Sequence, residues 1–129
     1  MYADADILYS YLKPTDWLKQ YSTRIINEIK LKTSAITITE LELISKRDFS
    51  EEFSNSILEK LENIKNLTIV PLKIEISKKA IELRKQFNLN IFDSLHAATA
   101  ILEKENIIST DKIFDLIPEL KRIDPREIS

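Results

Sequence analysis

Short stretches rich in β-branched residues alternate with amphipathic helical patterns along the chain, and this alternation constrains the fold most strongly. Strands are expected at 1–3, 33–38, 67–72, 106–109 and, as an edge strand ended by Pro125, 120–124. The patterns between them predict helices at 6–12, 16–31, 39–46, 50–64, 76–87, 92–105 and 110–117. Such alternation predicts an α/β fold with three layers, α/β/α, around a mostly parallel sheet of four to five strands.

The length and composition predict one domain over residues 1–129. The formal net charge of −2 provides no overall basic field for nucleic acid, so RNA binding requires a local patch or a bound cation. The chain has no cysteine, which excludes disulfides, thiolate metal ligands and cysteine nucleophiles. No apolar run reaches the roughly 20 residues of a membrane span, and the N-terminus has acids where a signal peptide has basic residues. We therefore expect a soluble cytoplasmic protein without membrane association.

The chain also contains no glycine. Glycine-rich phosphate loops of the Walker and dinucleotide-binding types are therefore excluded, because they need glycine for the backbone to approach phosphate. Asparagine is the next residue to tolerate a left-handed backbone. Asn66, Asn88 and Asn106 are expected to replace glycine as helix C-terminal caps.

Carboxylates follow several of the expected strands. Asp4, Glu40 and Asp111 come after the first, second and fourth strands, and Asp93 opens the helix that leads into the fourth. Sites in open parallel sheets form outside the carboxyl ends of the strands, so these acids could converge. A structural interpretation also exists, because acids are favoured at helix starts. The segment 37–40 matches a capping box, and Asp6 could cap the first helix.

A group of converging carboxylates needs a cation, because neighbouring negative charges repel one another. Oxygen ligands, without cysteine and with a single histidine, suit Mg²⁺ or Mn²⁺ rather than Zn²⁺. Such an ion can activate water and offset charge on a phosphodiester. A metal-dependent nuclease is therefore one chemistry that this pattern indicates.

Four segments, "YADADILYSYL", "SAITITELEL", "FDSLHAATA" and "IISTDKIF", resemble in order and spacing the PIN domain family, most closely the VapC-type toxins of prokaryotic toxin-antitoxin pairs. The resemblance implies a Mg²⁺- or Mn²⁺-dependent endoribonuclease whose catalytic, metal-binding acids are Asp4, Glu40, Asp93 and Asp111. Asp6 stands where the family more often has Asn, so it is a further candidate for a metal or water contact. Ser109 and Thr37 are the expected supporting residues.

The resemblance further implies three partners: an RNA substrate, a cognate antitoxin protein and a second copy of the chain. Lys112, Arg84 and His96 are candidates for contacts to RNA phosphates, although a solvated helix face or a packed histidine would look the same. Trp17 with Tyr9, Tyr11 and Tyr21 could line a dimer or antitoxin surface, or could be core residues.

Two other protein classes fit these residues less well. In haloacid-dehalogenase-type phosphatases the motif Asp-x-Asp continues with Gly and Thr, whereas Ile7 and Leu8 follow here. A response-regulator receiver needs an Asp after the third strand, and "LTIVPLK" has none. An RNA-processing PIN nuclease that is not a toxin, and a PIN-like module that binds RNA or protein without cutting, remain open.

Overall fold

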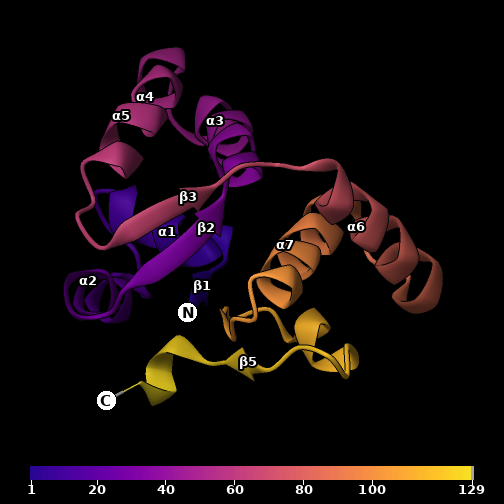
Figure 1. The fold of residues 1–129 in the computed structure, drawn as a ribbon. Helices are drawn as coiled ribbons and strands as arrows, with labels where there is room; N and C mark the ends of the chain where they lie inside the picture. The colour runs from indigo at the N-terminus through magenta and orange to yellow at the C-terminus, as the bar shows by residue number, and fades with distance from the viewer. Residues whose placement is uncertain (129) are drawn as a thin grey trace.

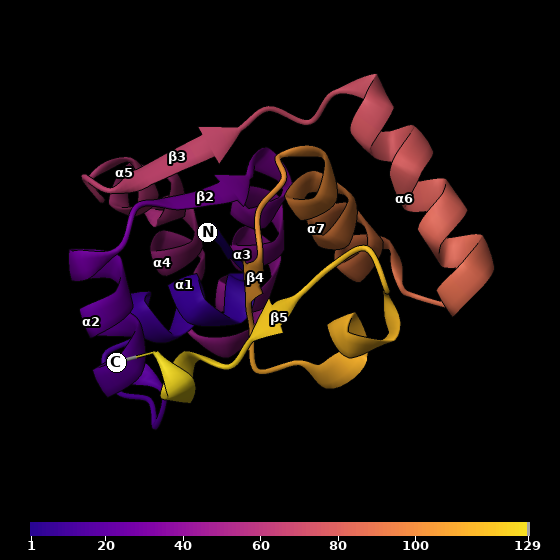
Figure 2. The same ribbon diagram turned by 60° about the horizontal axis from the view of Figure 1, so that its bottom comes forward.

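The computed structural model describes residues 1–128. The strands in this range form one five-stranded sheet. The strands are β1 (Tyr2–Ala3), β2 (Leu31–Ser34), β3 (Leu67–Val70), β4 (Ile107–Ile108) and β5 (Arg122–Ile123). Their order is β3-β2-β1-β4-β5, and all four pairs are parallel. Figure 2 shows this order, with the N-terminus between β2 and β4. The predicted α/β fold is confirmed, with a sheet that is parallel throughout.

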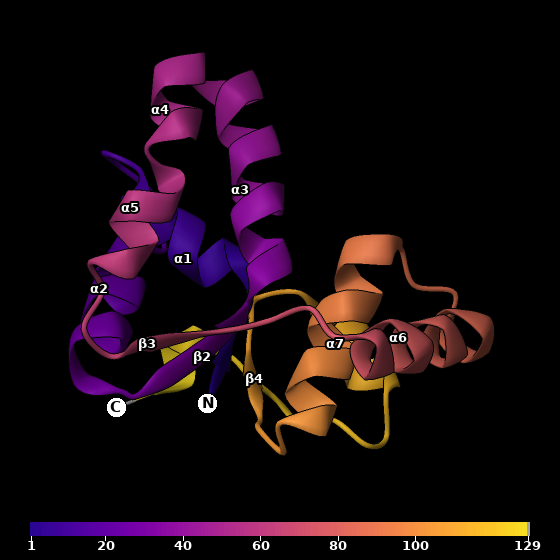
Figure 3. The same cartoon turned by 45° about the horizontal axis from the view of Figure 1, so that its top comes forward.

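Helices connect the strands and cover both faces of the sheet. They are α1 (Ala5–Leu12), α2 (Lys19–Glu28), α3 (Ala35–Asp48), α4 (Glu51–Asn55), α5 (Ile57–Glu62), α6 (Ile74–Phe87) and α7 (Ile91–Leu102), with 3₁₀ helices η1 (Lys112–Leu116) and η2 (Pro125–Glu127). Figure 1 shows α6 and α7 together, apart from α3, α4 and α5. Figure 3 shows α3 extending away from the sheet beside α4.

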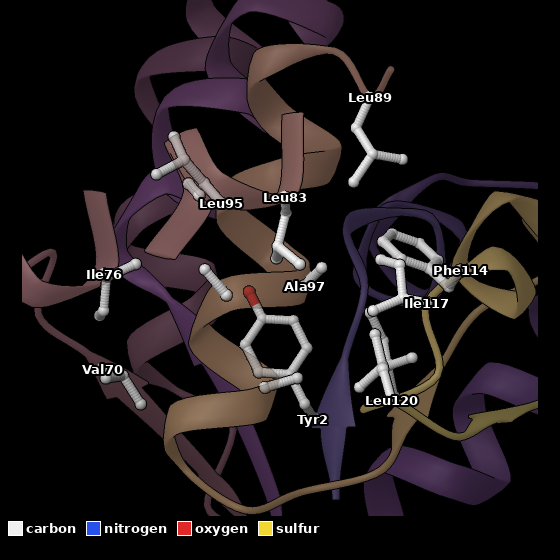
Figure 4. Close-up of a cluster of buried hydrophobic side chains, with 14 residues drawn as sticks. Tyr2, Val70, Ile76, Leu83, Leu89, Leu95, Ala97, Phe114, Ile117 and Leu120 are labelled. Atoms are coloured by element: carbon white, nitrogen blue, oxygen red, sulfur yellow. The ribbon is translucent and has the colours of Figure 1, made fainter. Parts of the chain in front are cut away.

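Alternation along the central strands produces two hydrophobic cores. Tyr2 and Ile107 contribute to the core beneath α6 and α7, which Figure 4 shows. Their neighbours Ala3 and Ile108 contribute to the core on the other face, against α1, α2, α3 and α5. Because successive strand residues point to opposite faces, two-residue strands suffice to separate the layers.

The second strand ends earlier than its sequence predicts. The prediction of a strand over 33–38 is wrong from Ala35 onward, because α3 begins there. Ser34 has an extended backbone, and its Oγ accepts a hydrogen bond of 3.1 Å from the backbone N–H of Ile36. This N-terminal cap outweighs the β-branched composition of the following residues. Glu40 is consequently in the second turn of α3, and the capping box predicted for 37–40 is wrong.

Two other helices differ from their predicted extents. The helix predicted over 16–31 covers only Lys19–Glu28. Leu18 is its N-cap residue and makes no side-chain capping bond. The helix predicted from Ser50 begins there as expected, with Ser50 Oγ accepting from Phe53 N–H, but it breaks at Ser56 into α4 and α5.

Within residues 1–128, Asn88 and Lys104 adopt the left-handed backbone. Asn88 ends α6 with φ of 55°, which confirms the predicted replacement of glycine. The other is Lys104, with φ of 57°, so the cap predicted at Asn106 is wrong. Asn66 also has no such role, because α5 ends at Asn63 in a right-handed conformation.

A search of the described helices for a membrane-spanning segment found none of sufficient length and apolar character.

Candidate active site

A cavity of about 400 Å³ opens where the carboxyl ends of β1 and β4 meet. The chain builds the sheet outward from β1 to β3 and then returns to the other side of β1 with β4. This reversal of strand order is where open α/β sheets bind ligands. The lining residues are Asp4, Ala5, Asp6, Tyr9, Glu40, Leu41, Ile44, Asp93, Thr110 and Asp111.

All five carboxylates singled out in the sequence line this cavity. Asp4 and Asp6 come from the β1–α1 junction, and Glu40 from α3. Asp93 lies in the first turn of α7, and Asp111 directly precedes η1. The structure thus brings together the acids that the sequence placed at one edge, while their roles in catalysis stay predictions.

Asp4 is held through both of its carboxylate oxygens. It is the N-cap of α1, with Oδ1 accepting from the backbone N–H of Ala5 at 2.8 Å. Its Oδ2 accepts from the hydroxyl of Ser109 at 2.7 Å. Burial raises the pKa of Asp4 above its ordinary value, although His96 and these hydrogen bonds oppose that shift. The alternative reading of Asp6 as the cap of this helix is wrong, since Asp4 has that place.

Asp6 makes a different set of contacts. Its Oδ2 accepts from the backbone N–H of Thr110 at 2.9 Å and from the Thr110 hydroxyl at 2.6 Å. Its Oδ1 is buried and has no hydrogen-bond partner among the residues described. Burial, followed by the negative charge of Asp4, raises the pKa of Asp6 to about 7. One oxygen of this carboxylate therefore lacks a hydrogen-bond donor within residues 1–128, and burial together with the charge of Asp4 disfavours its ionised form.

Asp93 and Asp111 form the more accessible side of the cavity. The backbone N–H of Asp93 donates to Asn90 Oδ1, the N-cap of α7, at 2.8 Å. Partial burial, with the charges of Asp111 and Glu40, raises the pKa of the Asp93 carboxyl. Asp111 Oδ1 accepts from the backbone N–H of Ile113 at 3.0 Å, so this exposed acid also caps η1. Asp111 therefore both caps η1 and belongs to the group of acids that line the cavity.

Glu40 contacts His96 directly. Glu40 Oε1 lies 2.6 Å from His96 Nε2, and His96 Nδ1 lies 2.6 Å from the hydroxyl of Tyr2. The histidine is 0% exposed, so the structure does not support the predicted contact of His96 with an RNA phosphate. Burial disfavours its charged form, yet Tyr2, Glu40 and Asp4 together raise the pKa of His96 well above its ordinary value.

The two predicted supporting residues have different places. Ser109 joins two of the acids, because its Oγ donates to Asp4 and accepts from the backbone N–H of Asp111 at 3.0 Å. Thr37 instead bonds Thr33, with 2.8 Å between the hydroxyl oxygens, and Thr33 donates to the carbonyl oxygen of Ala3. Thr37 thus fastens α3 to β1 and β2 without a hydrogen bond to a carboxylate.

The remaining candidates lie around this site or away from it. Lys112 is exposed beside Asp111 and stays a candidate for phosphate contact. Arg84 donates a hydrogen bond of 2.7 Å to Ser94 Oγ, which ties α6 to α7. Trp17 is exposed next to Arg126. Tyr9 belongs to the core, and the partly buried Tyr11 and Tyr21 pack against it.

Sequence reasoning missed two kinds of site residue. Thr110 holds Asp6 by two hydrogen bonds, and its position directly after the fourth strand was the available signal. The apolar wall formed by Tyr9, Leu41 and Ile44 was also missed, because apolar residues on α1 and α3 look like ordinary core positions.

The donor set suits a hard divalent cation in kind. It consists of carboxylate oxygens, the pKa of Asp4, Asp6 and Asp93 is raised, and Asp6 Oδ1 has no partner within the described part of the chain. Within residues 1–128, however, no three acid or histidine side chains already surround a common point as metal ligands. Binding an ion would therefore require some of these side chains to turn toward it.

Comparisons with solved structures show the same fold in toxin-antitoxin proteins. A toxin-antitoxin complex from Klebsiella pneumoniae has 20% identity and a TM-score of 0.72, with 98% of each chain covered. VapBC2 from Rickettsia felis, bound to a promoter DNA fragment, has 18% identity and a TM-score of 0.73, covering 95% of this chain and 96% of that one. Mycobacterium tuberculosis VapC20, described as a toxin that cleaves the sarcin-ricin loop, has 11% identity and a TM-score of 0.75, covering 93% and 98%.

A search of curated protein sequences returned no match. The sequence profile of the PIN domain matches residues 1–120, nearly the whole chain. The chain belongs to the PIN domain family.

Proposed function

We propose that this protein is a Mg²⁺- or Mn²⁺-dependent endoribonuclease and the toxin of a type II toxin-antitoxin pair. The observation that carries the proposal is the convergence of Asp4, Asp6, Glu40, Asp93 and Asp111 on one cavity. PIN nucleases generally use divalent metal ions, which agrees with an oxygen-only donor set. Toxin-antitoxin proteins among the structural neighbours support the toxin assignment.

In this proposal Asp4, Glu40, Asp93 and Asp111 hold the ion or ions, and Asp6 is a further contact. A bound divalent cation would activate water and offset the charge that develops on the phosphodiester. Asp4 keeps a fixed orientation because both of its oxygens accept hydrogen bonds. The scissile phosphate would enter from the open side of the cavity, where Asp93 and Asp111 lie. The exposed Lys112, next to Asp111, would assist its binding.

The reaction is a hydrolysis in which water attacks phosphorus and displaces the 3′ oxygen. Its products carry 5′-phosphate and 3′-hydroxyl ends. End analysis of cleaved RNA tests this assignment. Finding 2′,3′-cyclic phosphate ends would contradict it, because they arise from attack by the ribose 2′-hydroxyl.

The matched variants Asp93→Asn and Asp115→Asn test the site. Asp93 lines the cavity, whereas Asp115 is paired with Arg122 outside it, at 2.9 Å. Asp93→Asn should lower cleavage of single-stranded RNA at least about 100-fold, and Asp115→Asn should leave it within a few fold. Equal activity in the two variants would remove Asp93 from the proposed site.

The toxin role needs a separate test from the nuclease activity. Expression of the wild-type chain should arrest bacterial growth, Asp93→Asn should not, and coexpression of an antitoxin encoded beside the gene should restore growth. RNA cleavage without growth arrest would favour the alternative of an RNA-processing nuclease. Neither cleavage nor arrest would favour a PIN-like module that binds RNA or protein without cutting.

The antitoxin, a homodimer and a cytoplasmic location belong to the same proposal. Large apolar side chains that are exposed on several elements are candidates for contacts with the antitoxin or a second copy of the chain. They include Leu43, Phe49, Ile74, Ile91 and Leu116. Light scattering on the purified chain should give twice its 15.0 kDa mass. A mass of one chain at micromolar concentration would contradict the homodimer.

A further inference from the structure

His96 is buried behind the cavity, between Glu40 and Tyr2. Its ring is fully buried, with Nε2 directed at Glu40 and Nδ1 at the hydroxyl of Tyr2, each at 2.6 Å. Nε2 also lies 3.8 Å from Asp4 Oδ1. The imidazole therefore lies next to two acids from different elements, Glu40 on α3 and Asp4 directly after β1.

The direction of the hydrogen bond to Glu40 follows from the chemistry of the partners. An ionised carboxylate can only accept, so Nε2 carries the hydrogen and donates it to Oε1. Tyr2 fixes the ring from its opposite nitrogen. Tyr2 is itself held, because its hydroxyl oxygen accepts from the backbone N–H of Ser34 at 3.2 Å. Its ring is buried in the core against α7, which Figure 4 shows.

This series of contacts begins and ends on the same segment. Ser34 is the N-cap of α3, and Glu40 lies six positions later on that helix. Tyr2 from β1 and His96 from α7 complete the connection between them. Glu40 Oε2 makes no hydrogen bond within the described chain, and Glu40 lines the cavity. The hydrogen bond between His96 and Oε1 thus restricts the orientation of the Glu40 carboxylate and of its other oxygen, Oε2.

We infer that His96, oriented by Tyr2, is a positioning residue that holds the Glu40 carboxylate for the divalent cation. Partners of this kind behind metal ligands orient the ligand, and their loss typically lowers metal affinity or activity about 10- to 100-fold. The inference rests on the proposed function for the ion, but the contact between His96 and Glu40 can be tested without it.

Nuclear magnetic resonance tests the contact itself. The chain has one histidine, so its ring signals are unambiguous. The Nε2–H proton should be visible and shifted strongly downfield in the wild type. It should move upfield in Glu40→Gln and stay in place in Thr99→Val, which alters another buried hydrogen bond on α7, from Thr99 Oγ1 to Leu95 O. An unprotonated Nε2, or a signal that Glu40→Gln leaves unchanged, would overturn the inference.

Mn²⁺ binding, measured by electron paramagnetic resonance, tests the positioning role. His96→Leu should weaken Mn²⁺ binding about 10- to 100-fold and lower kcat more than it raises KM for RNA. His96→Gln retains an N–H donor and should recover most of the affinity, and Thr99→Val should match the wild type. In a Glu40→Gln background, His96→Leu should have little further effect. Unchanged Mn²⁺ affinity in His96→Leu would overturn the inference.

A fallback variant and the behaviour of the wild type complete the test of this inference beside the proposed function. If His96→Leu does not fold, Tyr2→Phe replaces it and should weaken Mn²⁺ binding several-fold; an unchanged affinity there would overturn the inference. A wild-type protein that binds Mn²⁺ and responds to these variants but cuts no RNA would support the role of His96 and contradict the nuclease. A wild type that binds no Mn²⁺ would contradict both.

Discussion

Ser109 Oγ donates a hydrogen bond of 2.7 Å to Asp4 Oδ2 and thereby joins residues 105 positions apart in the chain. The two residues directly follow the neighbouring strands β4 and β1. The same hydroxyl accepts from the backbone N–H of Asp111 at 3.0 Å. One buried serine therefore sets the relative position of two of the cavity's acids.

Ser109→Ala should accordingly lower stability as well as metal binding. The variant leaves a buried carboxylate oxygen and a backbone N–H without this partner, at a cost of about 1–3 kcal/mol in the free energy of unfolding. Urea denaturation measures that loss. Ser45→Ala is the matched control, because Ser45 is equally buried but its hydroxyl donates within α3, to the carbonyl of Glu42. The control should leave Mn²⁺ affinity unchanged, and an equal loss of affinity in both variants would contradict the role given to Ser109.

Asp6→Asn should stabilise the metal-free protein. The change removes a negative charge beside Asp4 and replaces an oxygen that has no partner among the described residues. A gain of about 1 kcal/mol in the free energy of unfolding is expected, because the repulsion between buried like charges is relieved. Saturating Mn²⁺ should reduce or reverse this gain, since the cation then offsets the charge. A variant that is less stable without metal would contradict the account of Asp6.

Tyr2→Phe should destabilise the fold without changing its shape. The lost hydroxyl serves both His96 Nδ1 and the backbone N–H of Ser34. Leaving these buried groups unsatisfied should cost about 1–3 kcal/mol in thermal or urea unfolding. Tyr11→Phe is the control, since the Tyr11 hydroxyl makes no hydrogen bond to any described side chain or backbone group. Equal stabilities for the two variants would show that the Tyr2 hydroxyl contributes nothing.

Lys104→Gly should raise stability, whereas the same substitution at Lys78 should lower it. Lys104 has φ of 57°, where glycine avoids the steric cost of a side chain, and the gain should be up to about 1 kcal/mol. Lys78 is exposed within α6, where glycine costs about 1 kcal/mol. Parallel urea denaturation of the two variants measures the difference. Loss of stability in both would contradict the left-handed backbone at Lys104.

The sequence predicted the fold class because alternating strands and helices leave few arrangements for a chain of this length. It also predicted the meeting of Asp4, Glu40, Asp93 and Asp111, because parallel strands bring their carboxyl ends to one edge. It failed between Ala35 and Ile38, where local β propensity competes with the cap at Ser34. It could not reveal that His96 contacts Glu40, because that contact depends on how α7 packs against β1 and α3.

In the proposed function, the group of acids around Asp4 cleaves RNA with the help of a divalent cation. The most direct measurement is cleavage of single-stranded RNA by the purified chain, first stripped with EDTA and then supplied with Mn²⁺ or Mg²⁺, beside Asp4→Asn under the same conditions. We expect no cleavage by the stripped protein, recovery of cleavage with added metal, and no recovery in Asp4→Asn. Cleavage that persists in excess EDTA, or that survives Asp4→Asn, would contradict the proposed function.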